Sequence, residues 1–138
     1  MDNNIKNKIV KTLNIKTIDI FLEIGAGNGS LTKEFISLPK FTYLLEIDKE
    51  FSTELEKNFY HIKKIKILTE NILKLNFKDI FKKEKIRILG NIPYNISSKI
   101  LFILSKKTNN IKDIHIMVQK EFAAKIIFIK KNSCNGYL

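Results

Sequence analysis

The sequence has little of what would tie it to an oxidising compartment or to a membrane. Cys134 is the only cysteine among the 138 residues, so no disulfide can form within the chain, which fits a reducing cytoplasm. No apolar run approaches the roughly 20 residues that a membrane-spanning helix needs, and the N-terminus lacks the apolar core of an export signal. We therefore expect a cytoplasmic protein with no membrane partner.

Patterns that bind metals or divide a chain into domains are absent as well. Neither His61 nor His115 has a cysteine or a carboxylate at the spacing of metal ligands, so we expect no metal site. No repeat and no stretch rich in proline, glycine or serine interrupts the sequence, and its length suffices for one domain with its own core. We expect residues 1–138 to form a single domain, and we expect that domain to be monomeric.

Acidic residues are scarce relative to basic ones. The 25 basic and 14 acidic residues leave a formal charge of +11, which favours a polyanionic partner, nucleic acid before membrane. All the basic residues except Arg87 are lysine, and the sequence is also crowded with Asn and Ile, which have AT-rich codons. Codon bias is therefore a competing explanation of the excess, although lysine attracts phosphate whatever its origin.

Apolar runs alternate with amphipathic segments along the whole chain. The apolar runs predict five strands, at residues 18–24, 41–47, 65–68, 86–89 and 114–118. Amphipathic spacing predicts helices at residues 4–13, 30–36, 49–59, 95–105 and 121–129, with Ser30 and Asp48 as N-caps. Residues 72–81 are expected to be irregular or weakly helical. The alternation predicts a parallel α/β sheet covered on both faces, with a ligand outside the carboxyl ends of its strands.

A glycine-rich segment follows the first predicted strand. Gly25, Gly27 and Gly29 alternate within residues 23–29, which lets the backbone turn sharply and approach a ligand closely, while the following helix directs free N–H groups at the loop. The spacing G-x-G-x-G differs from the G-x-G-x-x-G of dinucleotide-binding loops, which weakens a pyrophosphate-binding interpretation. A glycine-rich turn without a ligand is the alternative.

Polar residues follow the second and third predicted strands. Glu46 comes about 20 residues after the loop, where a carboxylate can accept both ribose hydroxyls of an adenosine; a surface carboxylate is the alternative. Asn71 can bond the amino group of an adenine, with a neighbouring backbone N–H for a ring nitrogen, but it is equally typical of a simple turn.

The segment Asn91-Ile92-Pro93-Tyr94 combines the groups that hold a flat nucleobase. Pro93 lacks a backbone donor and is expected to end the fourth strand in a rigid turn. An adenine amino nitrogen is a poor nucleophile because its lone pair is conjugated into the ring. The Asn91 side-chain oxygen and the Pro93 carbonyl can hold its two hydrogens, and Tyr94 can stack on the base. Such a site acts by positioning; an ordinary proline turn is the alternative.

Taken in order, these motifs resemble those of class I S-adenosylmethionine-dependent methyltransferases, which have a Rossmann-like, mostly parallel sheet. The sequence at residues 91–98 is similar, more narrowly, to the ribosomal RNA adenine dimethyltransferases, and Met-Val-Gln-Lys-Glu at 117–121 resembles the small-subunit enzymes. The resemblance implies in-line methyl transfer from S-adenosylmethionine to the amino groups of two adjacent adenines near the 3′ end of small-subunit rRNA.

The resemblance also implies roles for single residues. Gly25 and Gly27 would line the methionine and ribose side of S-adenosylmethionine. Glu46 would bind the ribose hydroxyls and Asn71 would meet the adenine. Asn91 would contact both the cofactor and the target amino group.

The same resemblance implies that the catalytic residues are Asn91, Pro93 and Tyr94, which together form the pocket for the target base. Asn71 departs from the family pattern, which usually has Asp there, so that a charge-assisted bond is lost and the NH₂ group can be misoriented.

Other departures concern the two ends. The family's opening Gly-Gln-Asn-Phe segment, its later sheet strands and its helical RNA-binding domain are not found in residues 1–138. We therefore expect a sheet that is incomplete on its C-terminal side, no C-terminal helical RNA-binding domain, and weak cofactor binding with little turnover. A large-subunit rRNA adenine methyltransferase and an inactive module that binds RNA or the cofactor are the alternatives.

Overall fold

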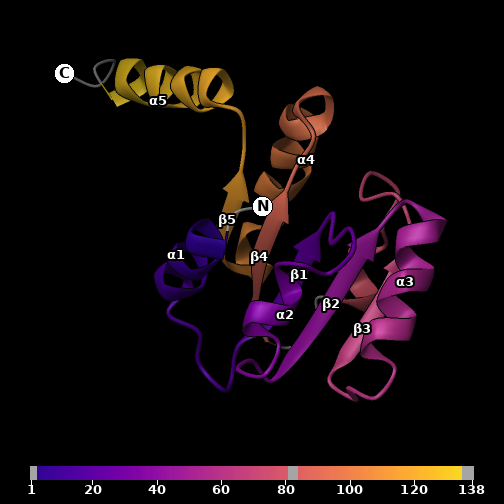
Figure 1. The fold of residues 1–138 in the computed structure, drawn as a ribbon. Coiled ribbons are helices and arrows are strands. Elements are labelled where there is room, and N and C mark those ends of the chain that lie inside the picture. The colour runs from indigo at the N-terminus through magenta and orange to yellow at the C-terminus, as the bar shows by residue number, and fades with distance from the viewer. Residues whose placement is uncertain (1–2, 81–83, 135–138) are drawn as a thin grey trace.

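The core of the fold is one parallel β-sheet. A computed structural model of the protein describes residues 3–80 and 84–134. In these residues the sheet has five strands in the order β3-β2-β1-β4-β5, and every neighbouring pair is parallel (Figure 1). The predicted parallel α/β sheet is therefore confirmed. The strands are β1 (Ile20–Ile24), β2 (Phe41–Glu46), β3 (Ile65–Thr69), β4 (Ile86–Asn91) and β5 (Ile111–Met117).

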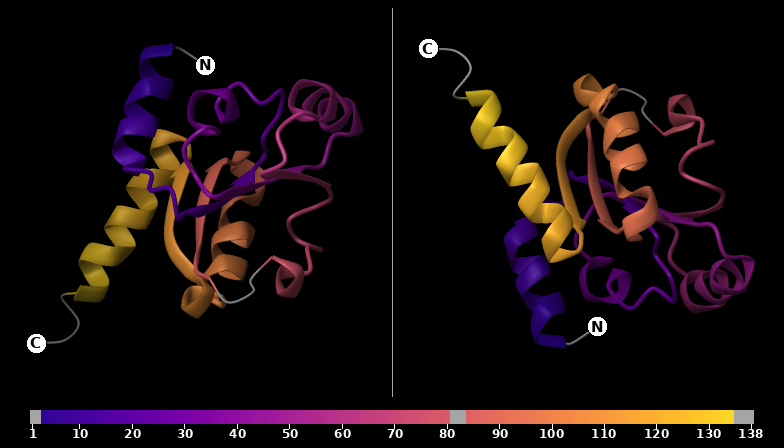
Figure 2. Two further views of the ribbon diagram at one scale, coloured as in Figure 1. Left: turned by 90° about the horizontal axis from the view of Figure 1, so that it is seen from below. Right: turned by 90° about the horizontal axis from the view of Figure 1, so that it is seen from above.

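Helices cover both faces of the sheet, as predicted. Figure 2 shows α1, α2 and α3 on one face and α4 on the other, while α5 extends away from the sheet beyond β5. The segment at residues 72–81 contains one short 3₁₀ helix, η1, and Phe81 lies outside the described residues. The helices are α1 (Asn3–Leu13), α2 (Thr32–Phe35), α3 (Lys49–Phe59), α4 (Tyr94–Ser105) and α5 (Lys120–Cys134), with 3₁₀ helices η1 (Phe77–Asp79) and η2 (Thr108–Asn110).

Alternate residues of β1 pack on opposite faces of the sheet. Phe21 packs against Phe35 of α2, with ring centroids 5.4 Å apart, in a cluster that includes Leu13 of α1. Leu22 packs in the other direction, in the cluster that contains Ile100 of α4. Successive side chains of a strand point to opposite faces, so a strand covered on both sides is apolar at nearly every position.

β4 and β5 are longer than the sequence predicts. β4 continues beyond Leu89 to Asn91 because β5 pairs with it as far as the register Asn91 opposite Met117. β5 begins before residue 114 and includes Asp113, a residue type that is rare in strands. The charge of Asp113 is accommodated because Arg87 of β4 bonds to it at 2.9 Å.

The helix predicted at residues 30–36 is shorter and begins differently. α2 spans Thr32–Phe35, follows Leu31 and has no side-chain cap, so the prediction of Ser30 as its N-cap is wrong. The Ser30 N–H instead donates to the Asn28 side chain at 3.1 Å, because the glycine-rich loop still continues at that point. Asp48 is confirmed as the cap of α3, since its side chain accepts two backbone N–H groups at 2.8 and 3.4 Å.

Arg87 connects the amino ends of β1, β4 and β5 to α1. Its guanidinium donates to Asp19 at 2.7 Å, to Asp113 at 2.8 Å and to the Leu13 carbonyl at 2.6 Å. Lys112 bonds to the second oxygen of Asp19 at 2.8 Å. The side chains of Arg87 and Asp19 are buried, so each ion depends on these partners rather than on water.

The partners of Asp19 determine its ionisation. Burial alone would raise the pKa of this carboxyl, but hydrogen bonds from Lys112, the Lys16 backbone and Arg87 outweigh it and hold the pKa below its ordinary value. The carboxylate therefore contributes stability above its unfolded-state pKa, and this contribution is lost as the pH falls through the folded-state pKa.

Replacing Arg87 with methionine should lower the free energy of unfolding by about 3–5 kcal/mol, because it removes the guanidinium that pairs with the buried Asp19 and the partly buried Asp113. Urea unfolding at neutral pH measures the change. The matched control is Lys40→Met, which removes the half-exposed ion pair of Lys40 with Glu84 at 2.6 Å and should cost less than about 1 kcal/mol. Equal losses for the two variants would contradict the structural role of Arg87.

Candidate functional site

The carboxyl ends of three central strands meet at one edge of the sheet. Ile24 of β1 pairs with Leu45 of β2 and Gly90 of β4, each of which lies one residue before the end of its strand. The residues that follow or end these strands, Gly25, Glu46 and Asn91, therefore lie close together. The strand order also reverses here, since β1 has β2 on one side and β4 on the other. Open α/β sheets bind ligands at such a point.

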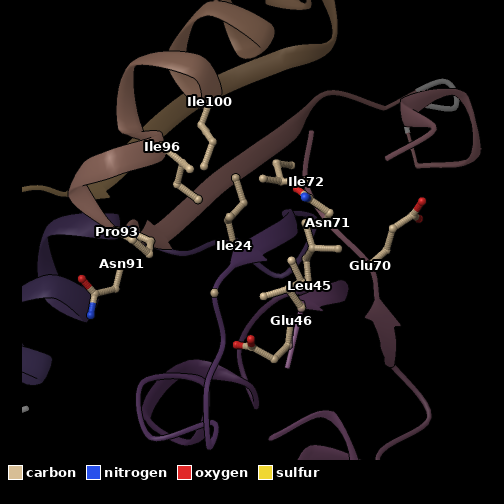
Figure 3. Close-up of a pocket in the computed structure, with 12 residues that line it drawn as sticks. Ile24, Leu45, Glu46, Glu70, Asn71, Ile72, Asn91, Pro93, Ile96 and Ile100 are labelled. Atoms are coloured by element: carbon tan, nitrogen blue, oxygen red, sulfur yellow. The ribbon is translucent and has the colours of Figure 1, made fainter. Parts of the chain in front are cut away.

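Three cavities meet at Asn91, which lines all of them. The inner cavity, about 220 Å³, reaches Glu46 and Asn71 and has a wall of isoleucines (Figure 3). The loop cavity, about 190 Å³, lies between the glycine-rich loop and β4 and includes Glu23. The rim cavity, about 400 Å³, is bounded by Pro93 and residues 117–119. Sites for small organic ligands commonly exceed about 300 Å³, so such a ligand would extend through the inner and loop cavities past Asn91.

The glycines of the loop serve different purposes. Gly25 has a φ of +71°, and a Cβ there would lie 3.2 Å from the Asn91 carbonyl oxygen. A side chain at Gly25 is therefore strained and would push the loop away from β4. At Gly29, a Cβ would lie 2.6 Å from the Phe59 ring and 2.9 Å from Leu55 of α3. The early position of the third glycine is thus explained by helix packing rather than by a ligand.

Glu46 fastens the glycine-rich loop to the end of β2. One carboxylate oxygen accepts the Gly27 N–H at 2.7 Å and the other accepts the Asp48 N–H at 3.0 Å. Glu46 is only 7% exposed, so the alternative of an ordinary surface carboxylate is wrong. Each oxygen has a further lone pair, and Glu46 lines the inner cavity, where these lone pairs can accept hydroxyl groups.

Asn71 is both a turn residue and a residue of the cavity wall. Its side-chain oxygen accepts the Leu73 N–H at 2.9 Å and its backbone carbonyl accepts the Lys74 N–H at 2.9 Å, as in a turn. The same residue lines the inner cavity (Figure 3).

The turn after β4 differs from the sequence prediction in one respect. The Pro93 carbonyl accepts the Ile96 N–H at 3.2 Å and the Ser97 hydroxyl at 2.9 Å, and so caps α4. The prediction that this carbonyl is free to hold an amino hydrogen is therefore wrong. The Asn91 side chain is exposed and forms no hydrogen bond within the described residues. The backbone of Tyr94 begins α4, but its side chain lies outside the description, so its stacking remains a prediction.

Glu23 is a site residue that the sequence analysis did not single out. It is buried in β1, accepts the Thr32 hydroxyl at 2.7 Å and lines the loop cavity. Burial raises its pKa to about 7, although the Thr32 bond acts in the opposite direction. The sequence does carry a signal, because a carboxylate within the apolar run Ile20–Ile24 has to be buried.

Two negative findings hold for the described residues. None of their helices combines the length and the apolar character needed to cross a membrane. They also contain no cluster of three histidine, cysteine, aspartate or glutamate side chains that could hold a metal ion.

The sequence matches one protein family along nearly its whole length. The family model described as ribosomal RNA adenine dimethylase matches residues 1–133. Ribosomal RNA small subunit methyltransferase A of Buchnera aphidicola subsp. Baizongia pistaciae is 38% identical over 131 residues, which cover 94% of this chain and 49% of the relative. The protein of the same name from Malacoplasma penetrans is 40% identical over 126 residues, or 91% of this chain and 45% of the relative. The chain thus spans about half the length of these relatives.

Solved structures share the fold. A dimethyladenosine transferase from Plasmodium falciparum has a TM-score of 0.80 and 31% identity, covering 91% of this chain and 45% of that one. The 23S rRNA methyltransferase ErmE has a TM-score of 0.77 and 23% identity, covering 89% and 48%, and at that identity the likeness shows the fold alone. The predicted Rossmann-like methyltransferase sheet is confirmed.

Replacing Glu23 with glutamine should stabilise the fold at alkaline pH. The folded-state pKa is about 7, against an ordinary value of 4.5, so ionisation increasingly favours the unfolded state as the pH rises between these values. At about pH 8 the variant should be more stable by up to about 3 kcal/mol, and the difference should disappear below the unfolded-state pKa. Urea unfolding across this pH range measures it, with the exposed Glu50→Gln as the control. Parallel pH profiles for wild type and Glu23→Gln would contradict the raised pKa.

Proposed function

Because the chain belongs to the ribosomal RNA adenine dimethylase family, we propose that it is the cofactor-binding core of an enzyme that methylates adjacent adenines in small-subunit rRNA. The observation that carries the proposal is the position of Asn91, which borders the inner, loop and rim cavities at once. One side chain can therefore contact a methyl donor on one side and an acceptor base on the other. S-Adenosylmethionine supplies an electrophilic methyl group when it is bound.

The inner and loop cavities have a donor and acceptor set that fits S-adenosylmethionine. The lone pairs of Glu46 suit the ribose hydroxyls, and Asn71 lies at the end of the inner cavity where a base would meet isoleucine side chains. Gly25 allows close approach at the junction of the two cavities, and Gly27 lines the loop cavity. Burial raises the pKa of the Glu23 carboxyl. A nearby cation would favour its ionised form, so Glu23 suits the ammonium group at the methionine end of the cofactor.

The rim cavity suits the target adenine. The Asn91 side-chain oxygen holds one amino hydrogen there. The Pro93 carbonyl caps α4, so the second acceptor on this turn is the Ile92 carbonyl. Within the described residues, no donor is bonded to that carbonyl. Two acceptors turn the nitrogen lone pair toward the methyl group, so that the site acts by positioning. Tyr94 would then stack on the base, as its position at the start of α4 allows.

The small-subunit substrate is favoured over the large-subunit alternative by the relatives. The proteins named ribosomal RNA small subunit methyltransferase A from Buchnera aphidicola subsp. Baizongia pistaciae and Malacoplasma penetrans are 38% and 40% identical to this chain, whereas ErmE is 23% identical. The charge of +11 supports binding to the phosphates of rRNA. A monomeric state in the cytoplasm remains our expectation for this protein.

Replacing Glu46 with glutamine should weaken binding of S-adenosylhomocysteine about tenfold, because an amide nitrogen replaces one of the two acceptor oxygens. Isothermal titration calorimetry on the purified chain measures the affinity. The control is Glu50→Gln, which removes an exposed carboxylate on α3 outside the three cavities. Absence of S-adenosylhomocysteine binding by the wild-type chain at millimolar ligand would refute the proposed cofactor site.

In a full-length context, replacing Asn91 with alanine should abolish methyl transfer, with a loss of at least about a hundredfold, because the amino group loses one of its two acceptors. The fold should persist, because the Asn91 side chain is exposed and forms no hydrogen bond within the described residues. Transfer of a tritiated methyl group to under-methylated small subunits measures the loss, and circular dichroism checks the fold. Transfer at the wild-type rate by this variant would show that the base pocket is wrongly assigned.

A further inference from the structure

The rim cavity has two polar side chains in its wall, and both are amides. Its lining residues are Asn91, Ile92, Pro93, Met117, Val118 and Gln119. Apart from Asn91 and Gln119, the side chains of these residues carry no N–H or O–H group. The Gln119 side chain is exposed and, like that of Asn91, forms no hydrogen bond within the described residues. The cavity therefore offers two uncharged amides in an apolar wall, which suits a neutral base rather than a phosphate.

The backbone holds Gln119 beside the turn after β4. β5 pairs with β4 as far as Asn91 opposite Met117, and the Ile92 N–H donates to the Met117 carbonyl at 3.3 Å. The two segments therefore stay in contact beyond the end of the sheet. On its other side, the Gln119 carbonyl accepts the Ala123 N–H at 3.0 Å in the first turn of α5. Gln119 is thus fixed at the rim cavity from both directions.

The amino group of the target adenine leaves Gln119 without a role. Its two hydrogens are held by the Asn91 side-chain oxygen and the Ile92 carbonyl. Two ring nitrogens, N1 and N7, flank the carbon that carries the amino group, and each can accept a hydrogen bond. Because neither atom of the Gln119 amide is committed to the protein, this side chain can present its NH₂ to one of them. Amide side chains commonly read the amino and ring-nitrogen edge of adenine.

We propose that Gln119 helps to select and orient the target base by donating a hydrogen bond from its side-chain NH₂ to N1 or N7 of the adenine. This inference rests on the proposed function, because it concerns the base in the rim cavity. Two acceptors at the amino group hold the base at one point only. A third hydrogen bond from the other side of the cavity fixes the plane of the base, and with it the direction of the amino lone pair.

The test is methyl transfer in a full-length context. The substrates are small subunits reconstituted with rRNA that carries adenine, 1-deazaadenine or 7-deazaadenine at the target position. Each analogue replaces one ring nitrogen with a C–H group. For one of the analogues, the rate relative to adenine should be about tenfold lower with the wild type than with Gln119→Ala, because a ring nitrogen matters only where a donor meets it. Comparing the two proteins cancels the effect of the analogue on the reactivity of its own amino group.

Two further variants make the result specific. Gln119→Glu keeps the shape of the side chain but has no NH₂, so it should lose the same discrimination as Gln119→Ala. The control is Asn109→Ala, which removes an exposed amide in η2 that lines none of the three cavities. This control should keep the wild-type ratio, and an equal change there would overturn the assignment to Gln119.

Calorimetry with S-adenosylhomocysteine separates the inference from the proposed function. Gln119 lines neither the inner nor the loop cavity, so Gln119→Ala should bind this ligand as the wild type does. If Gln119→Ala does not fold, the same comparison is made with Gln119→Glu.

The outcomes that contradict the two proposals differ. Equal ratios for the wild type and the Gln119 variants with both analogues would overturn the inference and leave the cofactor site intact. Absence of transfer to adenine by the wild type would overturn the proposed function, and the inference with it.

Discussion

The parallel pairing of β1 with both β2 and β4 is the constraint on which the rest of the structure depends. It places Ile24 opposite the residues that lie one position before the ends of β2 and β4, so that the loops after β1 and β2 and the turn after β4 start from one edge. The absence of a side chain at Gly25 lets the loop lie against the Asn91 carbonyl. Asn91 borders the inner, loop and rim cavities at this edge.

The two ends of the sheet satisfy buried charge in different ways. At the amino ends, Arg87 and Lys112 neutralise Asp19, and the cluster connects α1 to the sheet. At the carboxyl ends, Glu46 is satisfied by backbone N–H groups and keeps lone pairs toward the inner cavity. Glu23 has a single hydroxyl partner, and its pKa is raised accordingly. A carboxylate left in this condition lowers stability at neutral pH, which is a cost that functional sites commonly carry.

Hydrogen-bond capacity is also divided between structure and site. The Pro93 carbonyl is used to begin α4 and is therefore withdrawn from the base pocket. The Asn71 oxygen closes a turn by accepting the Leu73 N–H, which uses one of its two lone pairs. In both cases the residue type alone suggests an acceptor, and the local backbone decides how much of its hydrogen-bonding capacity is left for a ligand.

The sequence by itself determined the alternation of strands and helices, the helix cap at Asp48, and the residues at the strand ends, because these depend on local periodicity and on turn chemistry. It did not determine that β5 includes Asp113, that α2 is short, or that Glu23 lines a cavity. Each of these depends on partners distant in the chain: Arg87 for Asp113, the packing of Gly29 against Phe59 for the loop before α2, and Thr32 for Glu23. The tertiary structure alone decided which oxygens have lone pairs free for a ligand. The reason is that the donors that occupy an oxygen, such as backbone N–H groups, reach it only when the chain has folded.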